Sequence, residues 1–343
     1  MTEARLRVDR VGPHVSFQDA GRFRQMRFGV PASGPMDRLS HAAANVVLGN
    51  ERNATAIEVS VAGLTLTCDL GPVAVAVVGG EFVVRHRAGG RHHQHEVDSW
   101  TVVGLRTGDE LSIHAGTSGS WTYAAFAGHL EAPAWLGHTA THSISGLGGG
   151  QLGVGQILTV AGPRLDARRL GPVPQPDLSA PRGQARVVMG PQDHHFQPSA
   201  VTTFESAEYR LSDAYDRMGV RLIGPPLELR DSLSIPSEPI VRGSIQVAGD
   251  GVPTLLLADH QTTGGYPKIA TVIASDLDEV AQRRPGDAIS FTPVTPGEAI
   301  DIARRRAADV ATYLERLAGP GRTLTHRLMH ENLIGSVPTP DDE

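Results

Sequence analysis

The sequence is nearly devoid of lysine and cysteine, with one of each, Lys268 and Cys68. A single cysteine excludes an internal disulfide, and no ligand set at metal spacing remains, so no metal site is expected. The first residues carry no apolar leader and no run approaches membrane length, which predicts a cytoplasmic protein without a membrane partner. A net charge of −6, with arginines scattered rather than striped, argues against a nucleic-acid partner.

The composition favours a turn-rich, mainly β chain of more than one domain. It contains 343 residues, with 39 glycines and 24 prolines. Short apolar runs bounded by Gly, Pro or Asp predict strands at 73–78, 110–114, 121–126, 185–189, 254–258 and 288–291. Only two helices stand out, one over 38–48 with Asp37 as its N-cap and one over 298–317.

A proline-rich segment, 169–183, has no periodicity and is predicted to be a linker. It separates an N-terminal subdomain, 1–168, from a C-terminal subdomain, 184–318, which a tail, 319–343, follows. The similar lengths of these halves prompt a search for internal duplication.

Three pairs of segments recur in the same order at an offset of about 180 positions. The pairs are Asp37-Arg38 with Asp216-Arg217, the Gly-Asp turns at 108–109 and 286–287, and Glu58 with Glu238. We interpret them as two related β-barrels and expect Asp37 and Asp216 at equivalent positions. Such pairs commonly bind a ligand in the cleft between domains.

The richest candidate stretch runs from Gly243 to Leu277 and includes A-D-H-Q-T-T-G-G-Y-P-K-I-A (258–270), which contains the only lysine. Its glycines let a ligand approach the backbone, and a compact ammonium fits a tight pocket that arginine does not. The alternative is structural, with Lys268 flanking a strand and its stem packed on Tyr266. The Asp-Arg pairs could likewise orient a polar substrate or simply form turns.

Several motifs together resemble the biotin-dependent carboxyltransferase-like family, over about residues 5–300. They are Q-D-A-G-R (18–22), G-V-P-A-S-G-P-M-D-R (29–38), A-N-V-V-L-G-N (44–50), D-R-M-G-V-R-L (216–222), G-S-I-Q-V (243–247) and A-D-H-Q-T-T-G-G-Y-P-K-I-A-T-V-I (258–273). The family includes the C subunit of 5-oxoprolinase, Kip-antagonist-like proteins and the allophanate hydrolase subunit 2 region of urea amidolyase. The resemblance implies two cyclophilin-like β-barrels with a few helices.

The resemblance also implies an activity in a complex. A chain of this kind is expected to act as the C subunit of an ATP-dependent 5-oxoprolinase, a hydrolase that opens 5-oxoproline to L-glutamate. Its partners would be the A and B subunits of that enzyme, the second of them a Kip-inhibitor-like protein, and its cofactor ATP with Mg²⁺. One alternative is a carboxyltransferase component that acts on a urea-like amide, with biotin carried by another protein. Another is a regulatory binding partner of a Kip-inhibitor-like protein.

Activating an amide for hydrolysis requires cations and amide donors around a developing oxyanion and phosphate. We therefore assign catalytic roles to the cations Lys268 and Arg217 and to the orienting carboxylates Asp216 and Asp259. The substrate-binding candidates are Asp37, Arg38, Gln246, Gln261, Thr262, Thr263, Gly264, Gly265 and Tyr266, with Gly264-Gly265 as a backbone amide nest.

Overall fold

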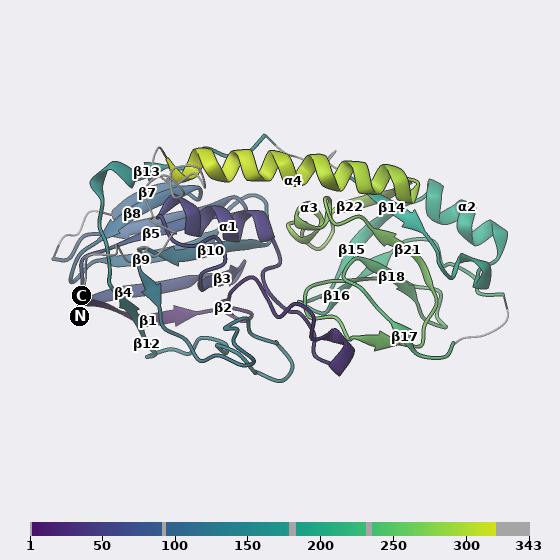
Figure 1. Cartoon of the computed structure of the whole chain (residues 1–343), viewed down its shortest axis with the longest axis horizontal. Helices are drawn as coiled ribbons and strands as arrows, with labels where there is room; N and C mark the ends of the chain where they lie inside the picture. Colours follow the sequence, from purple (N-terminus) through teal and green to yellow (C-terminus); the bar gives the residue numbers. More distant parts are fainter. Residues whose placement is uncertain (1, 91–93, 178–182, 231–234, 320–343) are drawn as a thin grey trace, which may run out of the picture.

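The computed structural model describes residues 2–90, 94–177, 183–230 and 235–319. Two β-rich halves lie side by side, and one long helix runs along the top of both (Figure 1). The prediction of a mainly β fold with a few helices is confirmed. Beyond Gly319, the predicted tail lies outside the described residues.

The N-terminal half consists of two sheets that enclose a shared apolar core. The seven-stranded sheet has the order β11 (His129–Leu130), β12 (Ile157–Ala161), β1 (Glu3–Val11), β4 (Leu64–Leu70), β9 (Glu110–Ala115), β6 (Phe82–Arg87), β7 (Gln94–Asp98). The six-stranded sheet has the order β13 (Gly171–Pro172), β8 (Thr101–Leu105), β5 (Val73–Val78), β10 (Trp121–Phe126), β3 (Ala56–Ser60), β2 (Ser16–Gln18). Leu6 and Leu66 of the first sheet pack with Val75 and Phe126 of the second.

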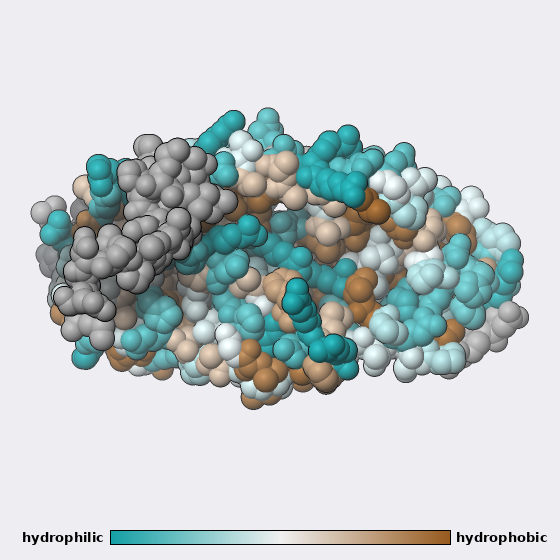
Figure 2. All heavy atoms as spheres, in the orientation of Figure 1, coloured by the Kyte–Doolittle hydropathy of each residue, from teal (hydrophilic) through white to brown (hydrophobic). Residues whose placement is uncertain are grey.

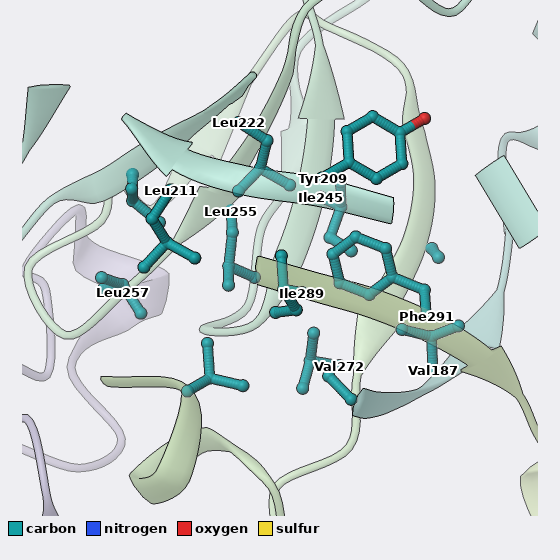
Figure 3. Close-up of a cluster of buried hydrophobic side chains, with 14 of the residues drawn as sticks. Val187, Tyr209, Leu211, Leu222, Ile245, Leu255, Leu257, Val272, Ile289 and Phe291 are labelled. Atoms are coloured by element: carbon teal, nitrogen blue, oxygen red, sulfur yellow. The ribbon is translucent and has the colours of Figure 1, made fainter. Parts of the chain in front are cut away.

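The C-terminal half contains a closed seven-stranded barrel. Its order is β14 (Gln184–Met189), β21 (Lys268–Val272), β18 (Ser244–Val247), β19 (Pro253–Leu256), β16 (Gly219–Ile223), β15 (Glu208–Tyr215), β22 (Ala288–Pro293). The parallel pairing of β14 with β22 closes the circle, and side chains such as Ile245, Leu255 and Phe291 fill the interior (Figure 3). A two-stranded ribbon, β17 (Glu238–Pro239) with β20 (Thr263–Gly264), lies outside the barrel order.

Both predicted helices form where the sequence placed them. Helix α1 (Arg38–Val47) begins after Asp37, whose carboxylate accepts the backbone N–H of Ser40 at 2.9 Å. Helix α4 (Pro296–Ala318) begins with a capping box between Thr295 and Glu298. The structure adds two shorter helices, α2 (Pro198–Ser206) and α3 (Leu277–Ala281).

Helix α4 follows the barrel in the chain, yet its C-terminal part packs on the N-terminal half. Leu314 is buried in a cluster with Val47 of α1 and Val78 of β5, and Val310 and Leu317 pack against that cluster. The helix therefore crosses from one half to the other (Figure 1). Its apolar residues Val310, Leu314 and Leu317 pack on the N-terminal subdomain, while its first turn follows β22 of the barrel.

One of the three sequence echoes marks the same turn in both halves. Gly108 donates its backbone N–H to Cys68 on β4, and Gly286 donates to Leu211 on β15, both at 2.8 Å. Asp109 and Asp287 each accept the backbone N–H three residues earlier, at 2.9 and 2.8 Å. The repeated Gly-Asp sequence thus builds the same turn before β9 and before β22.

In the other two pairs of recurring segments, the matched residues lie at different structural positions. Asp37 caps a helix, whereas Asp216 lies in the β15–β16 hairpin and accepts the N–H groups of Met218 and Gly219. The expectation of equivalent positions is therefore wrong, because an aspartate satisfies free backbone N–H groups equally well in a helix cap and in a turn. Glu58 is fully buried in β3, while the side chain of Glu238 is half exposed in β17.

The first part of the predicted linker packs on the N-terminal half. Gly171 and Pro172 form β13 at the edge of the six-stranded sheet, and Val173 is buried. Arg169 donates hydrogen bonds to the carbonyls of Val47 and Ala318, which tie the start of this segment to α1 and α4. Residues 178–182 lie outside the described part of the chain.

We expect Leu314→Ala to lower the free energy of unfolding by about 2–5 kcal/mol, because it empties the contact between α4 and α1. The matched control is Ile300→Ala on the same helix, where the side chain is exposed and the change should stay within about 0.5 kcal/mol. Urea unfolding followed by circular dichroism measures both. Equal losses would show that α4 does not hold the halves together.

Candidate functional site

The two halves meet around one buried guanidinium, that of Arg217 in the β15–β16 hairpin. It donates to the Asp259 carboxylate from Nε at 2.9 Å and from Nη2 at 3.1 Å. It also donates to Glu58 of β3, in the other half, and to the carbonyl of Gly34 at 2.7 Å. All three charged side chains are almost completely excluded from solvent.

Glu58 extends this contact to the start of α1. Its carboxylate accepts the Tyr123 hydroxyl at 2.7 Å and the backbone N–H of Met36 at 2.8 Å. The hydroxyl oxygen of Tyr123 in turn accepts the backbone N–H of Asp37 at 2.8 Å. A continuous hydrogen-bonded chain thus connects the barrel hairpin, strand β3 and the first turn of α1.

The charges in this network hold one another in the ionised state. Burial alone would lower the pKa of Arg217, but the carboxylates of Asp259 and Glu58 raise it above its usual value. Burial would raise the pKa of Asp259, whereas Arg217 lowers it below its usual range. Because both pKa values are shifted further away from neutrality, Arg217 and Asp259 do not exchange protons near neutral pH. Arg217 and Asp259, both predicted to be catalytic, are here the joint between the halves.

Asp37 is a buried carboxylate with a different protonation tendency. It accepts hydrogen bonds from Ser40 and, at 2.8 Å, from the side-chain amide of Gln282, the C-cap of α3. Burial, followed by the nearby charge of Asp278, raises its pKa to about 6. Arg38, its predicted companion, points away from this network, since its side chain is exposed and its backbone N–H donates to Asp278.

Lys268 begins strand β21 and is 4% exposed. Within the part of the chain that the structure describes, its ammonium has no hydrogen-bond partner. The carboxylate of Glu238, on the outer ribbon, lies within ion-pair range at 3.7 Å. Gln192 lies beside both residues, because it accepts the backbone N–H of Lys268 at 2.9 Å and donates to Glu238. A buried ammonium with unused donors is costly, and these donors are free to bind an acceptor group.

Two glutamines and the glycine loop surround this lysine. Gln246 is directly opposite Lys268 in the β18–β21 ladder and accepts the side-chain amide of Gln261 at 3.1 Å. A Cβ on Gly264 would lie 2.7 Å from the Gln246 amide nitrogen, and one on Gly265 would lie 2.9 Å from the Ile235 carbonyl. The loop therefore needs glycine at both positions to lie so close to Gln246 and to the Ile235 carbonyl.

The structure brings together only part of the predicted site. Lys268, Gln246, Gln261, Gly264 and Gly265 gather at one end of the barrel. In the same loop, Thr262 uses its carbonyl to accept the Ile240 N–H, and the side chains of Thr263 and Tyr266 are exposed. Asp216 caps its own hairpin and is separate from this cluster.

Sequence reasoning gave no role to five side chains that complete the two clusters. They are Glu58, Tyr123, Gln282, Gln192 and Glu238. One signal was present, a lone glutamate inside the apolar strand A-I-E-V-S (56–60), which predicts a buried charge in need of a partner. The partner itself lies 159 positions away in sequence and could not be found locally.

A cleft of about 380 Å³ lies between the halves, as predicted for paired domains. Its walls come from the first turn of α1, from α3 and from turns near 80 and 118, and Arg306 of α4 lies at its edge. Figure 2 shows the surface hollowed beneath α4 at this place. Of the predicted site residues, Asp37 lines the cleft, whereas the Lys268 cluster is not part of its walls.

Within the described ranges, no three His, Cys, Asp or Glu side chains are placed to hold a metal ion. In the same part of the chain, no helix combines the length and apolar character needed to cross a membrane.

Residues 28–293 match the family described as "Carboxyltransferase domain, subdomain A and B". The chain is 33% identical over 300 residues to the C subunit of 5-oxoprolinase from Haemophilus influenzae, which covers 86% of this chain and 93% of that protein. It is 29% identical over 352 residues to urea amidolyase of Saccharomyces cerevisiae, covering 96% of this chain but 18% of that protein.

Two solved structures resemble the fold closely. Kluyveromyces lactis urea carboxylase superposes with a TM-score of 0.80 at 26% identity, over 91% of this chain and 29% of that one. The structure of TTHA0988 superposes with a TM-score of 0.73 at 32% identity, over 84% of this chain. This chain spans about half, 55%, of the TTHA0988 chain.

We expect Arg217→Met to lower the free energy of unfolding by about 3–5 kcal/mol at pH 7, because it leaves two carboxylates buried without a counter-ion. The loss should shrink as the pH falls, because carboxyls buried without a counter-ion take up protons. Arg221→Met, which breaks an exposed pair with Asp250, is the matched control and should lose at most about 1 kcal/mol. Similar losses at both positions, measured by urea unfolding, would contradict the central role of Arg217.

Asp37 should make stability depend on pH. Its pKa rises from 3.8 unfolded to about 6 folded, so its contribution is fully present below pH 3.8 and is lost as the pH rises through 6. Between pH 4 and 7 the wild type should therefore lose roughly 2–3 kcal/mol relative to Asp37→Asn. Thermal unfolding of both proteins across this range measures the difference, and parallel curves would refute the raised pKa.

Proposed function

Because this chain belongs to the family of carboxyltransferase domains with subdomains A and B, we propose that it is the C subunit of an ATP-dependent 5-oxoprolinase. It would open 5-oxoproline to L-glutamate together with the A and B subunits. Two relatives named as the C subunit of 5-oxoprolinase match 86% and 91% of this chain, and it covers 93% and 97% of their lengths. Their shared name describes one part of a multi-subunit enzyme.

The observation that carries the proposal is the buried ammonium of Lys268, which has no hydrogen-bond partner among the described residues. Opening a lactam adds water to the amide carbon, breaks the C–N bond and moves a proton to the ring nitrogen. Negative charge develops on the amide oxygen during this addition, and a desolvated cation stabilises it far better than one in water. We assign that role to Lys268.

The side chains around Lys268 suit an amide substrate. Gln246 and Gln261 already pair their amides with each other at 3.1 Å, and a lactam presents the same donor and acceptor groups. Glu238 holds the lysine from the outer ribbon and is half exposed, so a ligand can replace it at the ammonium. Gly264 and Gly265 keep side chains away from this space.

The described residues do not provide a site for ATP and Mg²⁺. They contain no group of acidic and histidine ligands for a metal, and the glycine-rich stretch 146–156 lacks a Gly-Lys-Ser/Thr ending and leads into strand β12. We therefore assign nucleotide binding to the A and B subunits and derive no step through ATP on this chain. The nucleotide would supply the activation that makes lactam opening favourable.

The second candidate is the carboxyltransferase component of a urea carboxylase type of enzyme. Its support is the 0.80 TM-score to Kluyveromyces lactis urea carboxylase and the match to urea amidolyase over 96% of this chain. In that reaction Lys268 would face the ureido oxygen of carboxybiotin instead of a lactam. Biotin would be carried by another protein, since the only lysine here is buried in the sequence G-Y-P-K-I.

We expect Lys268→Arg and Lys268→Met to abolish most 5-oxoprolinase turnover, by roughly 100-fold or more, in the complex reconstituted with the A and B subunits. Methionine keeps a similar volume and removes the charge, so Lys268→Met should fold at least as well as the wild type. Arginine is too long for a side chain that is 4% exposed. Glutamate release, coupled to ADP formation, measures the activity.

The controls separate the candidates. Ile300→Ala removes an exposed side chain on α4, outside the Lys268 cluster, and should keep near-normal turnover. The purified chain alone should show no turnover. Near-normal activity of Lys268→Met would remove the lysine from the mechanism. Biotin-dependent carboxylation by the complex would favour the carboxyltransferase, and the absence of both reactions despite complex formation would favour a regulatory binding protein.

A further inference from the structure

Two loops place large apolar side chains on one exposed face. The first loop, 19–36, contains Phe23 and Phe28, and the second, 131–156, contains Leu136, Ile144 and Leu147. The exposed fractions reach 67% for Phe28 and 70% for Ile144. Hydrophobic spheres gather over these loops along the lower edge of the molecule (Figure 2). We call these five residues the loop face.

Buried side chains of the first loop hold the second loop in place through hydrogen bonds and a ring contact. Arg22 is fully buried, donates from Nε to the Trp135 carbonyl at 3.2 Å, also donates to the Ala140 carbonyl and stacks over the Trp135 ring. Asp19 accepts the backbone N–H of Thr139 at 2.9 Å. Because these contacts hold both loops in place, the exposed apolar side chains lie on an ordered surface.

Local conformation presents these side chains outward. Arg24 and Leu136 adopt positive φ angles, 68° and 52°, which L-residues rarely adopt. The Arg27 guanidinium stacks on the Phe28 ring at 4.7 Å and keeps that ring in the exposed position. Strained backbone and exposed aromatic rings persist together where a binding surface requires them.

The charge of the loop face indicates the chemistry of its occupant. Residues 20–30 expose two arginines, Arg24 and Arg27, and contain no acidic side chain, on a chain whose net charge is −6. Arginine and aromatic residues are the types most enriched at the centres of protein interfaces. A partner that fits this face would have an apolar surface rimmed with Asp and Glu, whereas a second copy would bring arginines against arginines.

The loop face is also continuous with the buried network between the halves. The backbone N–H of Ser143, next to Ile144, donates to Asp259 at 3.0 Å. The Gly34 carbonyl, at the end of the first loop, accepts from Arg217 at 2.7 Å. A protein that binds the loop face would therefore hold the loops that contact Arg217 and Asp259.

We propose that the loop face is the docking surface for another protein of the same enzyme, which would present an apolar patch with an acidic rim. This inference rests on the proposed function, because it takes the B subunit of the 5-oxoprolinase as that partner. Docking would hold the two loops against Asp259 and Arg217. Because Gln261 follows Asp259 by two positions and pairs with Gln246, docking would also constrain the segment that leads to the Lys268 cluster.

The test measures the affinity of the full chain for the purified B subunit, using isothermal titration calorimetry. Phe28→Ser and Ile144→Ser should each weaken binding at least 10-fold, and Arg24→Glu should weaken it more at low than at high salt. Ile223→Ser is the matched control, because Ile223 is 61% exposed on β16 and belongs to neither loop, and it should bind as the wild type does. Circular dichroism confirms that each variant is folded.

Several results would overturn the docking proposal. Unchanged affinity of the loop-face variants, equal weakening by Ile223→Ser, or no binding between the wild type and the B subunit would each do so. Self-association of the wild type that Phe28→Ser abolishes would assign the face to a second copy instead. If the wild-type complex forms and the variants break it, but the complex has no 5-oxoprolinase turnover, the docking surface stands and the proposed function fails.

Discussion

The structure depends on one arginine that neither half could bury alone. Arg217 comes from a hairpin of the barrel, and its two carboxylate partners come from both halves, Glu58 from β3 and Asp259 from the barrel. Two carboxylates without the guanidinium, or the guanidinium without them, would be buried charges with no compensation. The requirement for complete pairing fixes how the halves are oriented, because a shift of either half would break hydrogen bonds that water cannot replace.

Two buried cations in the barrel therefore have opposite characters. Arg217 has a planar fork whose donors meet Glu58, Asp259 and the Gly34 carbonyl, so it has little left to offer a ligand. Lys268 is buried to a similar extent, yet none of the described residues forms a hydrogen bond with its ammonium. Arg217, whose donors are occupied, therefore joins the two halves, whereas the Lys268 ammonium keeps donors that a ligand can accept.

Aspartate has different structural roles at different positions of this chain. Asp109 and Asp287 build one turn twice, Asp37 caps a helix and Asp216 closes a hairpin, although all four accept backbone N–H groups. A recurring Asp-Arg or Gly-Asp pair in sequence reports the need for an acceptor at a turn. It does not report where in a domain that turn lies. The Gly-Asp pairs therefore mark the same turn in both halves, whereas the Asp-Arg pairs do not.

The sequence by itself determined the local structure and the chemical inventory. Strands such as 73–78 and 121–126, the cap at Asp37 and the helix that became α4 followed from apolar periodicity and turn residues, which act over a few positions. The lone lysine within a glycine-rich loop was also visible. Only the tertiary structure decided that Arg217 and Asp259 form a joint with Glu58, that Asp216 remains outside the Lys268 cluster, and that α4 spans both halves. These outcomes depend on burial and on partners more than a hundred positions apart, and desolvation of a charge is a property of the packed molecule rather than of any segment.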